Sequence, residues 1–99
     1  MIKHIVFLKS IDNNKAKTDS IIKELAYQLR TLEAMIPEIV SIEVGINTSE
    51  RESAYGLSLL TTFKNEDDLN TYRYHPEHQK VIDYIKEYNL QTAVVDYKI

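Results

Sequence analysis

Apolar residues follow two different periods along this chain, and the order of those periods leaves few folds open. In residues 2–10 large apolar side chains alternate as in a strand, whereas in residues 18–36 they recur at intervals of one, three and four, which is typical of an amphipathic helix. Pro37 is expected to end this helix, because the residue before a proline is pushed out of the helical region. The polar run from Asp12 to Lys17 is predicted to be a turn.

Strand-like alternation returns in residues 38–47 and again in residues 55–63, where Leu57, Leu59, Thr61 and Phe63 share one face. The polar connection between these segments is expected to be a hairpin loop. A last strand is predicted over residues 91–99.

A second helical region is predicted between the third and fourth strands, and it is expected to be broken. Asn65 is a good helix N-cap residue, and the acidic residues that follow it suit the positive end of a helix. Pro76 fits the first turn of a second piece, where its missing N–H has no partner to lose, so His75 is the predicted cap or hinge. The second piece is expected to end at about Tyr88.

This order of elements, βαββαβ, predicts one α+β domain over residues 1–99 with a ferredoxin-like fold. Its four-stranded antiparallel sheet would carry the helices on one face. In the first strand, His4 and Val6 would point to one face, but Ile5 and Phe7 would point to the other. Because soluble monomers rarely expose large apolar patches, we expect the open face to be covered by a second copy, giving a dimeric α/β barrel.

Composition excludes several classes of function. The 99 residues contain 12 Lys and Arg and 15 Asp and Glu, giving a net charge of −3, and the basic residues are scattered, so no nucleic-acid partner is expected. The chain has no cysteine, which excludes disulfides and thiolate chemistry. No apolar run approaches the roughly 20 residues that span a bilayer, so a cytoplasmic protein with no membrane partner is expected. The chain has no glycine-rich phosphate loop, and no third ligand is evident beside His75 and His78, so neither a cofactor nor a side-chain metal site is expected.

The densest group of titratable and aromatic residues lies between Tyr72 and His78. His78 shares its helical stripe with Val81, Ile82, Ile85 and Tyr88, so it is predicted to point inward. Tyr72 follows Leu69 by three residues and is expected to share its inward face. Three charged residues are expected to face water instead: Arg73, Glu77 and Lys80.

The first and last strands of such a sheet are antiparallel neighbours, which brings His4 close to Asp96. A buried carboxylate needs a partner, and an imidazole is a suitable one. We therefore hypothesise that His4, Asp96, His78 and Tyr72 line one cavity between the sheet and the helices. His78 and Tyr72 would serve as base and acid, and Asp96 would orient an imidazole. The alternative is that His78 is a core histidine bonded to a backbone carbonyl.

Several short motifs together resemble those of the stress-responsive A/B barrel family. They are Ile2-Lys3-His4-Ile5-Val6, Ile36-Pro37, Ser41-Ile42-Glu43-Val44-Gly45, His75-Pro76-Glu77-His78 and Val94-Val95-Asp96-Tyr97. The resemblance runs over essentially the whole chain. It implies a dimeric α/β barrel, but it does not imply one reaction, because most members of the family have no assigned activity.

Enzymatic relatives suggest one possible use of the site. A plant polyketide cyclase of this family carries out an aldol condensation without a cofactor, and its catalytic tyrosine and histidine match Tyr72 and His78. Its N-terminal histidine matches His4, whereas Leu57 stands where that enzyme has a further cavity histidine. The wider superfamily also includes cofactor-independent monooxygenases that act on quinol-like aromatics. Another plant branch binds magnesium through backbone carbonyls, which would correspond to a site near Glu33, Ile36 and Ile39.

Three functions are therefore open. The chain would be a homodimer that binds a small apolar or aromatic molecule in a cavity without turnover. Alternatively, it would be a cofactor-free enzyme, similar to a polyketide cyclase, lyase or monooxygenase, that uses His78 and Tyr72 for proton transfer. The third is a structural stress protein with a filled core. A cavity beside His78 would separate the first two from the third.

Overall fold

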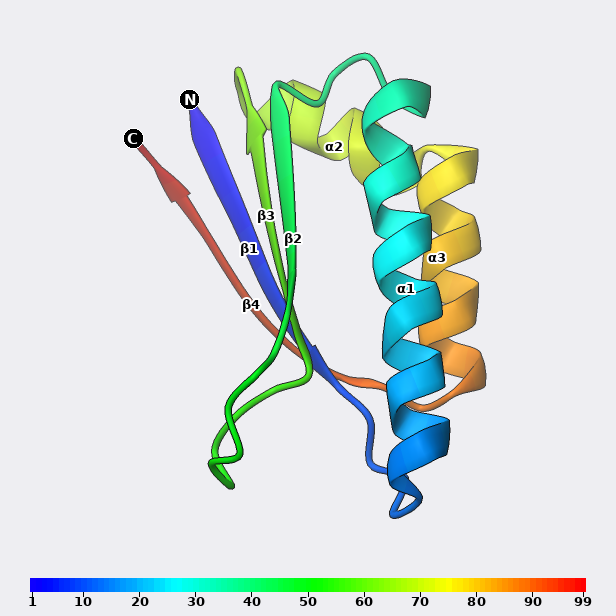
Figure 1. Ribbon diagram of the computed structural model, residues 1–99. Helices are drawn as coiled ribbons and strands as arrows, with labels where there is room; N and C mark the ends of the chain where they lie inside the picture. The colour runs from blue at the N-terminus through cyan, green and yellow to red at the C-terminus, as the bar shows by residue number, and fades with distance from the viewer.

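The computed structural model describes residues 1–99, which form one sheet and three helices (Figure 1). In chain order the elements are β1 (Ile2–Lys9), α1 (Lys15–Met35), β2 (Ser41–Ile46), β3 (Leu57–Phe63), α2 (Glu66–Tyr74), α3 (Pro76–Glu87) and β4 (Gln91–Lys98). None of the three helices combines the length and the apolar character needed to cross a membrane.

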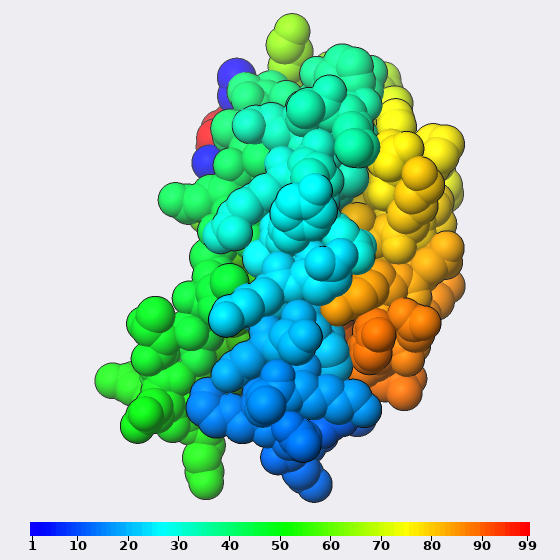
Figure 2. Space-filling model, turned by 45° about the vertical axis from the view of Figure 1, so that its right-hand side comes forward, coloured from blue at the N-terminus to red at the C-terminus, as the bar shows by residue number.

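All neighbouring strands are antiparallel, and their order across the sheet is β2-β3-β1-β4. The helices lie on one side of the sheet (Figure 1), and α1 and α3 run beside each other across the helical face (Figure 2). This arrangement confirms the predicted ferredoxin-like βαββαβ fold.

The core lies between the helices and one face of the sheet. Val6 of β1 pairs with Leu59 of β3 on one side and with Val94 of β4 on the other, so side chains from all three strands share the helical face. The side of α1 that packs against them is fully apolar, with Ile22, Leu25 and Leu29 all buried. The alternation predicted for β1 and β3 is therefore confirmed.

The other face of the sheet carries apolar side chains that no helix of the chain covers (Figure 1). Phe7 is 42% exposed, Val95 is 58% exposed and Tyr97 is 44% exposed. These residues point away from the helices because they alternate with the inward-facing positions of β1 and β4.

The start of the first helix differs from its prediction. The helix begins at Lys15 instead of Thr18, because the side chain of Asn14 accepts a hydrogen bond from the backbone N–H of Lys17 at 3.0 Å and caps the helix there. The predicted turn over Asp12–Lys17 is therefore wrong in its second half. The end of the helix agrees with the prediction, since Ile36 has an extended backbone before Pro37.

The predicted break in the second helical region is confirmed. His75 lies between α2 and α3 with an extended backbone, and its Nδ1 accepts a hydrogen bond from the Glu77 N–H at 3.1 Å. Pro76 occupies the first turn of α3. Tyr88, which the helical spacing placed on the inward stripe, is exposed because α3 ends at Glu87 and the chain turns there.

Candidate functional site

A cavity of about 430 Å³ lies between the sheet and the helices. Side chains from β1, β3, β4 and all three helices line it, and nine of its fourteen lining residues are hydrophobic. Pockets of roughly this size and apolar character hold small organic ligands in other proteins.

Tyr72 of α2 lies at the wall of this cavity and is fully buried. Its ring contacts Phe63 at a centroid distance of 5.1 Å and His78 at 4.2 Å. Its hydroxyl has no hydrogen-bond partner within the protein, although buried polar atoms are nearly always paired. Burial raises the pKa of this hydroxyl, so Tyr72 is a neutral O–H donor at neutral pH.

His78 of α3 lines the same cavity and is half-buried. Its Nδ1 lies 3.1 Å from the backbone carbonyl oxygen of Arg73. A carbonyl can only accept, so Nδ1 carries the proton, and Nε2 is left as a lone-pair acceptor. Burial lowers the pKa of His78; the Arg73 hydrogen bond opposes this change and the nearby His4 reinforces it. The imidazole is therefore neutral and able to accept a proton at Nε2.

His4 of β1 is the third polar group of the wall and is buried. Its strand position is directly opposite Asp96 of β4, and its Nδ1 lies 2.5 Å from the Asp96 carboxylate. The second carboxylate oxygen of Asp96 accepts a hydrogen bond from the Arg73 guanidinium at 3.0 Å. Because Asp96 binds Nδ1 of His4, the nitrogen left for the cavity is Nε2.

The structure brings three of the four predicted site residues to one cavity, namely His4, Tyr72 and His78. Asp96 does not line it but lies behind His4, and its side chain is 28% exposed, so the expectation of a buried carboxylate is wrong. β4 is an edge strand, which leaves Asp96 open to water on one side.

Arg73 faces water as expected, with its side chain 45% exposed, but sequence reasoning missed its contacts with the site. Its side chain lines the cavity and bonds Asp96, and its carbonyl bonds His78. Arg73 thus contacts the imidazole of His78 directly and the imidazole of His4 through Asp96. The available signal was its position in the last turn of α2, because carbonyls at a helix end lack intrahelical partners.

The model of the stress responsive A/B barrel domain matches residues 2–99. The chain belongs to this family. The match covers every strand and helix that forms the cavity, so the resemblance suggested by the short motifs is confirmed.

Solved structures of similar fold include one further member of the stress-responsive A/B barrel family and a protein of unknown function. A dimeric protein of unknown function with a ferredoxin-like fold from Bacteroides fragilis is 30% identical, with a TM-score of 0.89, and the alignment covers 99% of this chain and 95% of that one. A family member with a ferredoxin-like fold from Mesorhizobium loti is 15% identical, with a TM-score of 0.72 and coverages of 99% and 95%.

An enzyme shares the same fold. The hydroxynitrile lyase of Passiflora edulis is 18% identical, with a TM-score of 0.79, and the alignment covers 99% of this chain and 92% of that one. At this identity the likeness extends to the fold alone. No curated protein sequence matches the chain.

The magnesium site that one plant branch of the stress-responsive A/B barrel family implies would use backbone carbonyls near Glu33, Ile36 and Ile39. The Ile36 carbonyl already accepts a hydrogen bond from the Ile39 N–H at 3.2 Å, and the side chains of both isoleucines are buried. No three histidine or acidic side chains of the chain gather where they could hold a metal ion. Nothing in these contacts favours a cation, and the magnesium site stays a prediction.

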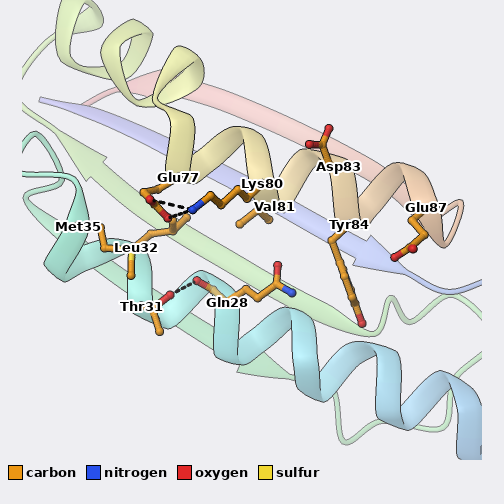
Figure 3. A pocket seen from close by; sticks show the side chains of 10 residues that line it. All are labelled: Gln28, Thr31, Leu32, Met35, Glu77, Lys80, Val81, Asp83, Tyr84 and Glu87. Atoms are coloured by element: carbon orange, nitrogen blue, oxygen red, sulfur yellow. Dashed lines mark hydrogen bonds and ion pairs between the residues drawn. The ribbon is translucent and has the colours of Figure 1, made fainter.

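A second hollow, of about 470 Å³, lies on the solvent side of the helices between α1 and α3 (Figure 3). Glu77 and Lys80 form an ion pair at 3.1 Å on its α3 side, while Asp83 and Glu87 also line it. This helix groove contains none of the residues predicted to form the site. It places Glu77 and Lys80 on the outer side of α3, as expected from their helical positions.

Proposed function

We propose that this protein is a homodimer in which each subunit binds a small, largely apolar or aromatic molecule in the cavity beside Tyr72 and His78. The observation that carries the proposal is Tyr72, which lines the cavity and whose fully buried hydroxyl has no partner in the protein. An unsatisfied buried hydroxyl costs about 1–3 kcal/mol, and a ligand oxygen that accepts its hydrogen bond would remove that cost.

The polar groups of the wall define the head group of such a ligand. Tyr72 offers an O–H donor, and Nε2 of His78 offers an acceptor. The two rings lie 4.2 Å apart, so one head group can meet both. A carbonyl or phenol oxygen that accepts from Tyr72, next to a hydroxyl or acidic C–H that faces His78, would satisfy both residues.

The open face of the sheet supports the homodimer. Phe7, Val95 and Tyr97 are exposed and point away from the helices, although large apolar surfaces of this kind are usually covered in soluble proteins. The similar protein from Bacteroides fragilis is dimeric. Two copies of this chain would cover each other's open faces with an isologous contact.

Binding of 4-hydroxyacetophenone, which carries a ketone and a phenol on an aromatic ring, tests the ligand site by calorimetry or saturation-transfer NMR. The Tyr72→Phe variant removes only the hydroxyl, and we expect it to weaken binding by about three- to tenfold. The same variant should be as stable as the wild type or more stable, because it deletes an unpaired buried group. A variant that loses stability but retains affinity would indicate a structural role for the hydroxyl and would overturn the proposal.

A second candidate function is cofactor-free proton transfer, and the protonation state of His78 favours it. With its proton on Nδ1, neutral His78 can remove a proton from a carbon next to a carbonyl through Nε2. The C–H bond breaks, an N–H bond forms, and the electron pair moves to the carbonyl oxygen, which Tyr72 stabilises by its O–H. The resulting enolate carbon can attack a second carbonyl of the same molecule, and the imidazolium returns its proton to the new alkoxide.

Exchange of the methyl hydrogens of 4-hydroxyacetophenone in D₂O, followed by NMR, separates the two candidates. Proton transfer predicts that the wild-type protein accelerates exchange over buffer and that His78→Gln abolishes the acceleration while the ligand still binds. A protein that binds the ketone without accelerating exchange would retain the binding function and exclude this reaction on this probe.

A further inference from the structure

The cavity wall is unusual in its charge. None of its lining residues is Asp or Glu, although the chain contains 15 acidic residues and has a net charge of −3. The charged side chains that do line it are both cationic, Arg73 and Lys86, and its remaining titratable groups are His4, Tyr72 and His78. An apolar cavity whose wall carries only cations and neutral hydrogen-bonding groups favours an anion.

The acidic residues of α3 and its Lys86 lie on different sides of the helix. Its acidic residues, Glu77, Asp83 and Glu87, all line the helix groove, where the Asp83 side chain points away from α1 (Figure 3). Lys80, which lies on that side too, is paired with Glu77. Lys86 lines the cavity instead. One helix thus presents acids to the outer groove and a cation to the inner cavity.

The two cations of the cavity differ in what already binds them. The Arg73 guanidinium donates hydrogen bonds to Asp96 and Asn70, so its charge is largely offset. Lys86 forms no ion pair within the chain. It is exposed at the cavity rim with Thr92 of β4, about two helical turns after His78, which places it roughly 12 Å farther along the axis of α3.

We propose that the ligand class is an amphiphilic carboxylate, bound with its anionic group at Lys86 and its apolar body between α3 and the sheet. This inference rests on the proposed function, because it names the ligand of the same cavity. The polar end opposite the carboxylate reaches Tyr72 and His78. Ile82, Ile85 and Val94 contact the body between the two ends. A molecule with one polar end and an uncharged tail would leave Lys86 without a partner.

The test uses 6-(4-hydroxyphenyl)-6-oxohexanoate and its methyl ester, which share the aryl ketone and differ only in the charge at the far end. Calorimetry with the full chain should give about fivefold tighter binding of the acid than of the ester at low salt. The preference should fall as salt is added, because the pair at Lys86 is open to water. Lys86→Gln should lower the affinity for the acid to about that for the ester.

Lys80→Gln is the matched control, because Lys80 lies on the same helix but faces the helix groove. This variant should keep the full preference for the acid. Lys86 also lies in the last turn of α3, where a cation stabilises the helix dipole, so a purely structural role would lower stability without changing the acid-to-ester ratio. Equal binding of acid and ester by the wild type would overturn this inference but leave the ligand cavity standing. Failure of both molecules to bind would overturn the inference and the proposed function together.

Discussion

The two faces of the sheet are built from the same four strands and yet differ in almost every physical respect. On the helical face Leu59 is buried in the core, and the ring of Tyr72 packs against the ring of His78. On the open face Phe7 and Val95 are similar in character to core residues but remain exposed. Strand alternation puts apolar side chains on both faces, whereas this chain supplies helices for only one of them.

This difference shows that burial within one chain is not a measure of which residues matter for the working protein. The helical face is complete in a single copy and holds the candidate site. The apolar side chains of the open face would be buried only in a dimer, where a second copy covers them. Three predictions would break or sharpen this contrast, and their expected effects decrease in the order given.

The largest effect is expected from neighbouring residues of β3 that point to opposite faces. Leu59→Ala should lower the free energy of unfolding by about 3 kcal/mol, because it removes a buried side chain from the core. Leu60→Ala, on the open face, should lower it by about 1 kcal/mol. Urea unfolding at low protein concentration measures both. Equal losses would contradict the difference between the two faces.

A charge on the open face should act on assembly more than on folding. Val95→Glu places two carboxylates in the proposed dimer contact and should raise the dissociation constant of the dimer by about 30-fold, or roughly 2 kcal/mol. Sedimentation velocity measures the change. Tyr27→Glu is the control, since Tyr27 is 64% exposed on α1, on the helical side. A Val95→Glu protein that remains a dimer would exclude the open face as the interface.

The smallest effect is expected from pH and arises on the helical face. Because burial lowers the pKa of His78, the unfolded chain takes up a proton before the folded one does as pH falls. The contribution of His78 to stability is therefore complete above its ordinary pKa of about 6.5 and is lost on acidification below it. His78→Gln should make the stability difference between about pH 7.5 and 5.5 smaller in urea titrations. An unchanged difference would mean that His78 is protonated equally in both states.

The sequence predicted the faces and strand positions of the site residues better than the contacts between their side chains. Helical spacing correctly placed Tyr72 and His78 on the inward side, and antiparallel pairing correctly placed His4 opposite Asp96. These relations depend on periodicity and topology, which local sequence determines. The ion pair of Arg73 with Asp96 could not be predicted, because it depends on how far an edge strand leaves Asp96 open. The early start of α1 was missed because Asn14 was taken as part of a turn and not as a cap.

The proline that breaks the second helical region also decides where a proton lies on His78. In an unbroken helix the Glu77 N–H would bond the Arg73 carbonyl four residues earlier. Here the chain turns at His75 and Pro76, and the Glu77 N–H bonds the His75 ring instead. The Arg73 carbonyl then accepts from Nδ1 of His78 and from the side-chain amide of Gln79. Pro76, which has no titratable group, thus influences which nitrogen of the His78 imidazole is basic.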